Sequence, residues 1–219
     1  MTNAENRILI ISGGYIDDTF LSELSERERY SMIIAADRGL AAADRLELSL
    51  DLIVGDFDSV PEDVLARFRN KSTPIKTFPK EKDKTDTQIA IELALNNNPT
   101  AIDIVGATGC RMDHVLANIH LLLLPLRQNI HANILDLNNR IYLMDKSFSI
   151  HKTEQYGGYV SLLPFTEKVA GLTLKGFKYP LDHVLLNSGN SIGISNEIKD
   201  DVARVEFSQG ILVVMEAKD

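Results

Sequence analysis

The stretch "DLIVGDFDSV", residues 51–60, joins a short apolar run to two aspartates that stand one residue apart. An uninterrupted apolar run of this length is typical of a strand that is buried on both faces, as in a parallel sheet covered by helices. A carboxylate is costly to bury unless something neutralises it, so Asp56 and Asp58 call for a function at the end of such a strand. Because alternate residues of an extended chain point to the same side, we expect the two carboxylates to converge.

Residues 1–137 repeat this pattern, with short apolar runs alternating with segments of helical period. The alternation predicts an α/β domain with a mostly parallel sheet flanked by helices. One helix is expected to begin near Asp86 and another near Met112, the second ending near Pro125. Strands are expected over residues 8–14, 31–37, 51–56, 74–78, 101–107 and 131–137.

Residues 138–219 have a different texture, with short and often alternating apolar runs separated by Gly, Asn, Ser or Pro. This texture predicts a smaller, all-β sandwich domain that follows the first one, with "LNNR" at 137–140 as the joint. Strands are expected over residues 140–145, 147–152, 159–165, 171–177, 191–195, 203–207 and 211–216.

Composition narrows the class of protein. The 219 residues carry a formal net charge of −8 without any cluster of Lys and Arg, which argues against binding to nucleic acid or to a membrane surface. The most apolar run, at 121–126, is far shorter than the roughly 20 residues that span a bilayer, so no membrane segment is expected. The single cysteine, Cys110, cannot form an internal disulfide, and the N-terminus lacks the features of a signal peptide, which together indicate the cytoplasm.

Acids follow several of the expected strands, where the ligand crevice of a parallel α/β sheet lies. Two carboxylates about 4 Å apart repel by about 4 kcal/mol at an effective dielectric near 20, and a divalent cation would relieve that repulsion. Ligands that are all oxygen suit magnesium, manganese or calcium better than zinc. Any one of these acids alone could instead cap a helix or end a turn. The acids are Asp37, Asp56, Asp58, Asp83, Asp86 and Asp113.

A second informative stretch is "IVGATGCRMDH", residues 104–114. Gly106 and Gly109 would let the backbone approach a phosphate while amides at the start of the next helix point at it. The stretch matches neither the GxxxxGK[ST] loop nor GxGxxG, and a plain tight turn remains an equal alternative. Arg111 favours the phosphate interpretation, because a guanidinium binds phosphate oxygens bidentately and Asp113 can orient it.

Together these motifs resemble the thiamine pyrophosphokinase family. The resemblance rests on "AADRGL" at 35–40, "GDFDS" at 55–59, "DKTD" at 83–86, "GATGCRMDH" at 106–114 and "SN" at 195–196. It implies an N-terminal α/β catalytic domain that binds ATP and metal, a β-sandwich that helps bind thiamine and dimerise, and a homodimer with active sites at the subunit interface. The implied reaction transfers a diphosphate group from ATP to the hydroxyethyl group of thiamine, giving thiamine diphosphate and AMP.

The same resemblance implies roles for particular residues. Asp56, Asp58 and Asp83 would be Mg²⁺ ligands, with Asp37 at the same cluster, and the catalytic set would be Asp56, Asp58, Asp83 and Arg111. Ser195 and Asn196 would contact thiamine from the partner subunit. Nucleotide-binding residues would be Thr85, Asp86, Gly106, Thr108, Gly109, Arg111 and Asp113.

Two other functions fit parts of the sequence. "DFDSV" at 56–60 also fits the signature of haloacid-dehalogenase-type phosphatases, in which the first aspartate becomes a covalent aspartyl phosphate. That short match does not account for "DKTD" or for the β-rich second half. A nucleotide- or vitamin-binding sensor without turnover is the third hypothesis, and the retained acids speak against it because a binder of anions gains by losing carboxylates.

Overall fold

The computed structural model describes residues 6–219 except 59, 71–72 and 80–82, and it divides into two compact units, Met1–Leu137 and Asn138–Asp219. Among the described residues, no helix has the length and apolar character needed to cross a membrane. The elements of the first unit are β1 (Arg7–Ile11), α1 (Asp18–Arg27), β2 (Met32–Ala36), α2 (Gly39–Arg45), β3 (Leu52–Gly55), α3 (Glu62–Asn70), β4 (Ile75–Thr77), α4 (Asp86–Leu95), β5 (Ala101–Val105), α5 (Met112–Leu121), α6 (Leu123–Leu126) and β6 (His131–Leu135).

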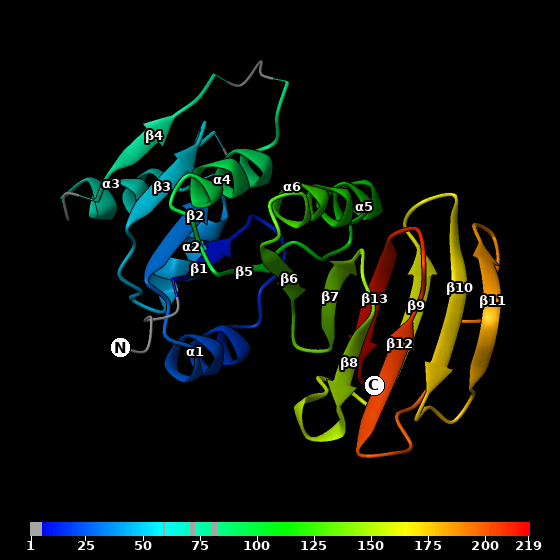
Figure 1. Cartoon of the computed structure of the whole chain (residues 1–219). Coiled ribbons are helices and arrows are strands. Elements are labelled where there is room, and N and C mark those ends of the chain that lie inside the picture. Colours follow the sequence, from blue (N-terminus) through cyan, green and yellow to red (C-terminus); the bar gives the residue numbers. More distant parts are fainter. Residues whose placement is uncertain (1–5, 59, 71–72, 80–82) are drawn as a thin grey trace. The chain divides into compact units, whose positions relative to one another are not determined.

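The first unit is built on parallel strands in the order β4-β3-β2-β1-β5-β6, which confirms the predicted α/β class and all six predicted strands (Figure 1). Residues 8–11 of β1 are fully buried, because β1 lies near the middle of the sheet with helices on both faces. The connections from β1 through β4 run toward one edge of the sheet, and those from β4 through β6 run toward the other. Since strand–helix–strand crossovers are right-handed, α1, α2 and α3 lie on one face and α4, α5 and α6 on the other.

The direction of the connections reverses between β1 and β5. The chain leaves β1 toward β2, whereas it leaves β5 toward β6 on the opposite side. In sheets of this kind, ligands bind in the crevice outside the carboxyl ends of the strands at such a switch point. The fold therefore directs attention to the loops that follow β1 and β5.

Both helices predicted in this unit are present, and their ends show why they begin and stop there. Thr85 caps α4 by accepting a hydrogen bond from the Gln88 amide at 3.2 Å. The helix from Met112 stops earlier than predicted, at Leu121, and Pro125 falls inside the separate short helix α6. Proline is tolerated there because the amide it lacks would have no partner in a first helical turn.

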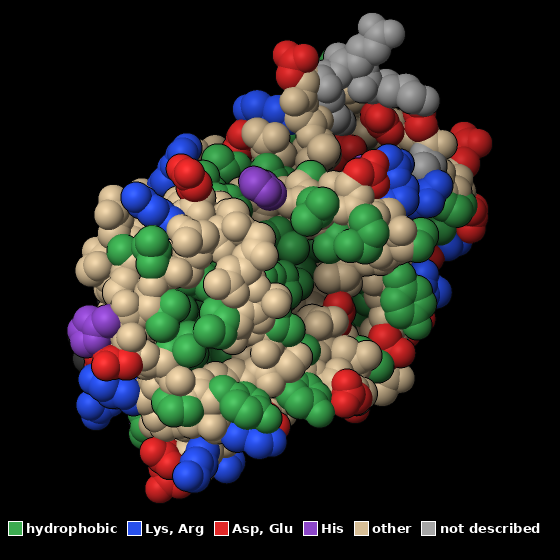
Figure 2. Space-filling view, turned by 90° about the vertical axis from the view of Figure 1, so that its right-hand side faces the viewer, with side chains coloured by type: hydrophobic (Ala, Val, Ile, Leu, Met, Phe, Trp, Pro, Cys, Tyr) green, Lys and Arg blue, Asp and Glu red, His purple; other side chains and the backbone are tan. Residues whose placement is uncertain are grey.

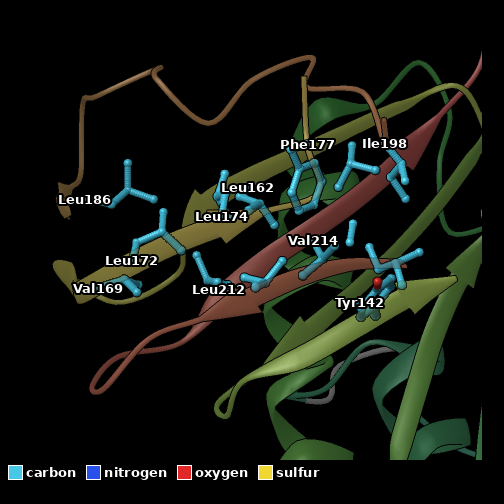
Figure 3. Packing of buried hydrophobic residues seen from close by; sticks show 14 residues of the cluster. Tyr142, Leu162, Val169, Leu172, Leu174, Phe177, Leu186, Ile198, Leu212 and Val214 are labelled. Atoms are coloured by element: carbon cyan, nitrogen blue, oxygen red, sulfur yellow. The ribbon is translucent and has the colours of Figure 1, made fainter. Parts of the chain in front are cut away.

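The second unit consists of antiparallel sheets, as predicted. One is β7-β13-β9, and the other is β11-β10-β12-β8. Figure 3 shows how side chains from both sheets, among them Leu162, Leu174 and Val214, meet in one buried core. The elements are β7 (Asn139–Met144), β8 (Phe148–His151), the 3-10 helix η1 (Lys152–Glu154), β9 (Tyr159–Pro164), β10 (Lys168–Lys175), β11 (Leu181–Asn187), β12 (Val202–Glu206) and β13 (Leu212–Ala217).

The structure corrects one predicted strand and adds another. Residues 191–195 form a turn instead of a strand, with Ser195 at φ 53°. Ile192 and Ile194 gave the stretch its apolar alternation, but 50% and 42% of their surfaces are exposed. The missed strand, β11, has mostly exposed residues and pairs with β10 through register shifts, so its sequence lacks a clean period of two.

Candidate active site

A pocket of about 590 Å³ opens at the carboxyl ends of β1, β2 and β5, entirely within the first unit. Its volume is in the range of sites that bind small molecules and cofactors. The wall is made by the loops after β1 and β5, the ends of β2 and β3, the first turn of α4 and one face of α5. These segments are residues 12–15, 36–38, 56, 84–87, 106–111, 114–115 and 118.

The loops after β1 and β5 are joined by backbone hydrogen bonds. The Ser12 amide donates to the Val105 carbonyl and the Gly14 amide donates to the Gly106 carbonyl, both at 2.8 Å. A Cβ at Gly14 would lie 2.4 Å from the Gly106 carbonyl oxygen, so only glycine allows the two backbones to come this close. Gly106 itself has φ 67°, which glycine adopts without strain. The pairing fixes both loops at the mouth of the crevice.

The loop after β5 has carbonyls held by the protein and amides that have no backbone acceptor among the described residues. Its carbonyls are engaged elsewhere, since Gly106 accepts from Gly14 and Ala107 accepts from Asn118 Nδ2 at 2.8 Å. In a trans peptide the following N–H points away from the carbonyl, so the amides of Ala107 and Thr108 point away from those partners. Within the described chain, the amides of residues 107–111 donate no backbone hydrogen bond. Amides without a backbone acceptor in a loop that leads into a helix make this loop a candidate anion-binding site.

Of the predicted acids, Asp37, Asp56 and Asp86 line the pocket. Asp37 follows β2 at φ 47°, a backbone conformation that aspartate adopts more readily than most residues. Asp56 accepts a hydrogen bond on Oδ1 from the Asp58 amide at 3.1 Å, which is also the geometry of a turn-forming aspartate.

The chain is not extended between Asp56 and Asp58, where alternation was expected to place both carboxylates on one side. Phe57 has φ 63° and its side chain is only 9% exposed, so it turns into the interior. Asp58 and Asp83 are both exposed and lie outside the set of residues that line the pocket. Among the residues that the structure describes, no three His, Cys, Asp or Glu side chains are grouped closely enough to hold a metal ion. The ligand roles of these acids therefore stay predictions.

Basic side chains line the same pocket. Arg111 forms a bidentate ion pair with Asp113, with Nε to Oδ1 at 3.2 Å and Nη2 to Oδ2 at 2.6 Å. These hydrogen bonds raise the pKa of Arg111 and lower the pKa of Asp113 to about 2. Both side chains are about two-thirds exposed, so the pair orients the guanidinium without burying it. Arg38 and Lys84 are also among the described residues of the lining.

Thr85, Gly106, Thr108 and Gly109, which were predicted to bind nucleotide, also line the pocket. Asp113 is outside that set and reaches the site through Arg111.

Ser195 and Asn196, predicted to contact thiamine, lie in the second unit and have different environments. Asn196 is only 3% exposed, and its amide bonds to the backbone of Tyr179 in both directions, at 3.0 Å through Oδ1 and 2.7 Å through Nδ2. Ser195 is exposed, and its amide donates to Ser161 Oγ at 2.9 Å. Asn196 thus shapes the turn that presents Ser195.

Three buried polar residues of the lining escaped the sequence analysis, namely Ser12, Thr87 and Asn118. None belongs to a charged motif. The one available signal was Asn118, a polar residue within the apolar periodicity of α5, "MDHVLANIHL".

Comparison with known proteins gives consistent matches over both units. The family model described as "Thiamin pyrophosphokinase, catalytic domain" matches residues 25–134, and "Thiamin pyrophosphokinase, vitamin B1 binding domain" matches residues 147–212. Thiamine pyrophosphokinase from Bacillus subtilis (strain 168) is 37% identical over 166 residues, covering 75% of this chain and 77% of the relative. Thiamine pyrophosphokinase 1 from Arabidopsis thaliana is 27% identical over 187 residues, covering 81% and 69%.

Solved structures agree with these matches. The crystal structure of thiamine pyrophosphokinase from Bacillus subtilis superposes with a TM-score of 0.87 at 32% identity, covering 97% of this chain and 99% of that one. The corresponding protein from Geobacillus thermodenitrificans gives a TM-score of 0.83 at 30% identity, covering 97% and 98%.

Proposed function

The chain belongs to the thiamine pyrophosphokinase family, and we propose that it transfers the diphosphate group of ATP to thiamine, giving thiamine diphosphate and AMP. The observation that carries the proposal is the pocket at the switch point of the sheet. It combines a loop whose amides, residues 107–111, have no backbone acceptor among the described residues with carboxylates and cations that line the same pocket. Such a combination suits a polyphosphate substrate that arrives with a metal ion.

Charge balance supports a divalent cation. Among the described residues, the lining contains three aspartates and three Lys or Arg residues, whose formal charges cancel, so together these groups offer no net positive charge to a triphosphate. Magnesium bound to the phosphates would neutralise part of their charge, and it commonly takes one or two protein carboxylates and completes its shell with phosphate and water. The oxygens of Asp37, Asp56 and Asp86 fit that requirement, and we keep Asp58 and Asp83 as proposed ligands.

The residues of the chain act mainly by positioning. The loop amides and Arg111 hold the triphosphate, which leaves the β-phosphorus facing the incoming hydroxyl of thiamine. When bound, Mg²⁺ polarises the phosphoryl oxygens and stabilises the charge that develops on them. The thiamine oxygen forms a bond to the β-phosphorus, the bond to the bridging oxygen of the α-phosphate breaks, and AMP leaves. A pocket carboxylate accepts the hydroxyl proton.

We further propose a homodimer in which Ser195 contacts thiamine in the partner's site. Each unit carries exposed apolar side chains that support a contact with another protein chain, Met112 and Leu116 in the first and Leu185, Ile192 and Ile194 in the second, each more than 40% exposed. Figure 2, viewed from the side that carries β10 and β11, shows hydrophobic side chains at the surface among uncharged ones. Apolar surface of this kind is typical of protein–protein contacts.

The product of the reaction tests the function directly. The protein is incubated with ATP, Mg²⁺ and thiamine, and the nucleotide released is identified. AMP formed in step with thiamine diphosphate supports the proposal, ADP indicates an ordinary kinase, and phosphate released without thiamine indicates a phosphatase.

Mixed dimers test the shared site. Subunits carrying Asp56→Asn and subunits carrying Ser195→Ala are each expected to be poorly active, and combining them restores activity by leaving one intact site per dimer. No recovery after verified subunit exchange would mean that each site is built within one chain.

A further inference from the structure

Three polar side chains line the pocket although each is more than nine-tenths buried. Ser12 is 5% exposed, and Thr87 and Asn118 are each 8% exposed. They come from three different elements, since Ser12 follows β1, Thr87 lies in the first turn of α4, and Asn118 lies in the last turns of α5. We call these three residues the polar floor. Burial of such groups is unfavourable unless their hydrogen bonds are made. The hydrogen-bonding partners of these three side chains therefore indicate their function.

The protein satisfies only part of this capacity. Ser12 Oγ and Thr87 Oγ1 share one hydrogen bond at 2.6 Å, so one hydroxyl donates and the other keeps its own hydrogen. Asn118 donates one Nδ2 hydrogen to the Ala107 carbonyl at 2.8 Å, and no other bond of its side chain occurs in the described chain. Its Oδ1 remains an acceptor. Since the rest of each side chain is packed in protein, a partner can reach these groups only from the pocket.

An amide acceptor and a hydroxyl donor that line one pocket complement one chemical pattern in particular. An aminopyrimidine edge presents an exocyclic amine, which donates, next to a ring nitrogen, which accepts. Both substrates of the proposed reaction carry this edge, on the adenine ring of ATP and on the pyrimidine ring of thiamine. The surroundings favour adenine, because the loop that would hold its phosphates, residues 107–111, lines the same pocket. Val115 and Ala107 supply apolar surface beside the floor.

We infer that the polar floor reads the aminopyrimidine edge of adenine, with Asn118 Oδ1 accepting from the exocyclic amine and the Ser12–Thr87 pair donating to the ring nitrogen. The inference rests on the proposed function and makes these three residues the determinants of nucleotide specificity. Asn118 has a second task, because its Nδ2 holds the Ala107 carbonyl and thereby links base recognition to the phosphate loop.

The experiment compares ATP with an analogue that has hydrogen in place of the 6-amino group, measuring kcat/KM for each with saturating thiamine and Mg²⁺. In the wild type ATP should be preferred, and Asn118→Ala should lower that preference by about tenfold, the effect of one neutral hydrogen bond. Thr87→Val keeps the shape of the side chain and leaves the Asn118–Ala107 bond in place. It should lower the preference for ATP over the analogue with carbon in place of ring N1, with little effect on the 6-amino comparison.

Asn133→Ala is the matched control, because Asn133 is also a buried amide, 3% exposed, but bonds Asp103 at 2.8 Å outside the pocket. It should lower the melting temperature and leave both preferences unchanged. An unchanged preference in Asn118→Ala and Thr87→Val, in an active and folded enzyme, overturns the inference. If Asn118→Ala or Thr87→Val keeps its preference for ATP but loses the preference for thiamine over the analogue with a hydroxyl group in place of the pyrimidine amine, the assignment to adenine is overturned. A wild type that forms no AMP from ATP and thiamine rejects the proposed function itself.

Discussion

Replacing Gly14 by alanine should separate the two loops that form the mouth of the pocket. The added Cβ would lie 2.4 Å from the Gly106 carbonyl oxygen and 2.5 Å from that of Thr108, and both atoms are backbone. Neither can rotate away as a flexible side chain would, so one loop must shift by about 1 Å to restore ordinary contact distances. Overpacking of this kind costs about 1–3 kcal/mol. Loss of the 2.8 Å bond from Gly14 to Gly106 adds about 1 kcal/mol.

The expected loss of unfolding free energy is therefore about 2–4 kcal/mol. Urea denaturation of the whole chain measures this loss of unfolding free energy. Steady-state kinetics should show a raised KM for ATP with a smaller change in the KM for thiamine. Gly158→Ala is the matched control, since a Cβ there meets nothing within 4 Å. Gly13→Ala is intermediate, with its nearest contact, Arg38 Cβ, at 3.3 Å. A Gly14→Ala protein with the urea midpoint and ATP affinity of Gly158→Ala would refute the role of loop pairing.

Three further predictions concern charged and buried groups. Arg111→Lys should lower kcat/KM for ATP by at least tenfold, because lysine lacks the planar fork that matches phosphate oxygens, and near-normal kinetics would contradict phosphate binding. Asp56→Asn should lower turnover by orders of magnitude and reduce the thermal stabilisation that Mg²⁺ with an ATP analogue confers; full activity with unchanged stabilisation would leave Asp56 as a turn former. Asn196→Ala should destabilise the second unit by about 3 kcal/mol in urea denaturation, because it leaves the backbone amide and carbonyl of Tyr179 unpaired, and a neutral effect would count against that network.

The strands of the first unit could be predicted because burial on both faces leaves a clear mark on the sequence. β2 and β3 are continuous runs of apolar residues, and β1 is apolar after Arg7, as suits strands between two layers of helices. β5 keeps the pattern except at Asp103, which is buried and paired with Arg7. An exposed strand leaves no such mark. β11 escaped prediction for that reason, while residues 191–195 imitated a strand with two isoleucines that point outward.

The site was predictable where it uses charge. Acids at the ends of β2 and β3 and Arg111 after β5 are conspicuous because a charge at those positions needs an explanation, and the structure brings Asp37, Asp56 and Arg111 to one pocket. Asp58 shows the limit of the reasoning. Alternation holds only while the chain is extended, and the left-handed backbone at Phe57 ends it between the two aspartates.

Uncharged groups set the geometry that the charges use. Gly14 and Gly106 bring two loops together, Asn118 holds the next carbonyl, and the trans peptides turn the Ala107 and Thr108 amides away from these partners. These contacts are made before any ligand arrives, so the loop need not be ordered on binding. Substitutions of the charged residues should therefore change turnover with little effect on folding, whereas substitutions of the scaffold residues should change stability and nucleotide affinity together. The two kinds of residue differ in where they make their hydrogen bonds. Gly14, Gly106 and Asn118 bond or pack within the protein, whereas the charged residues are proposed to bind the ligand.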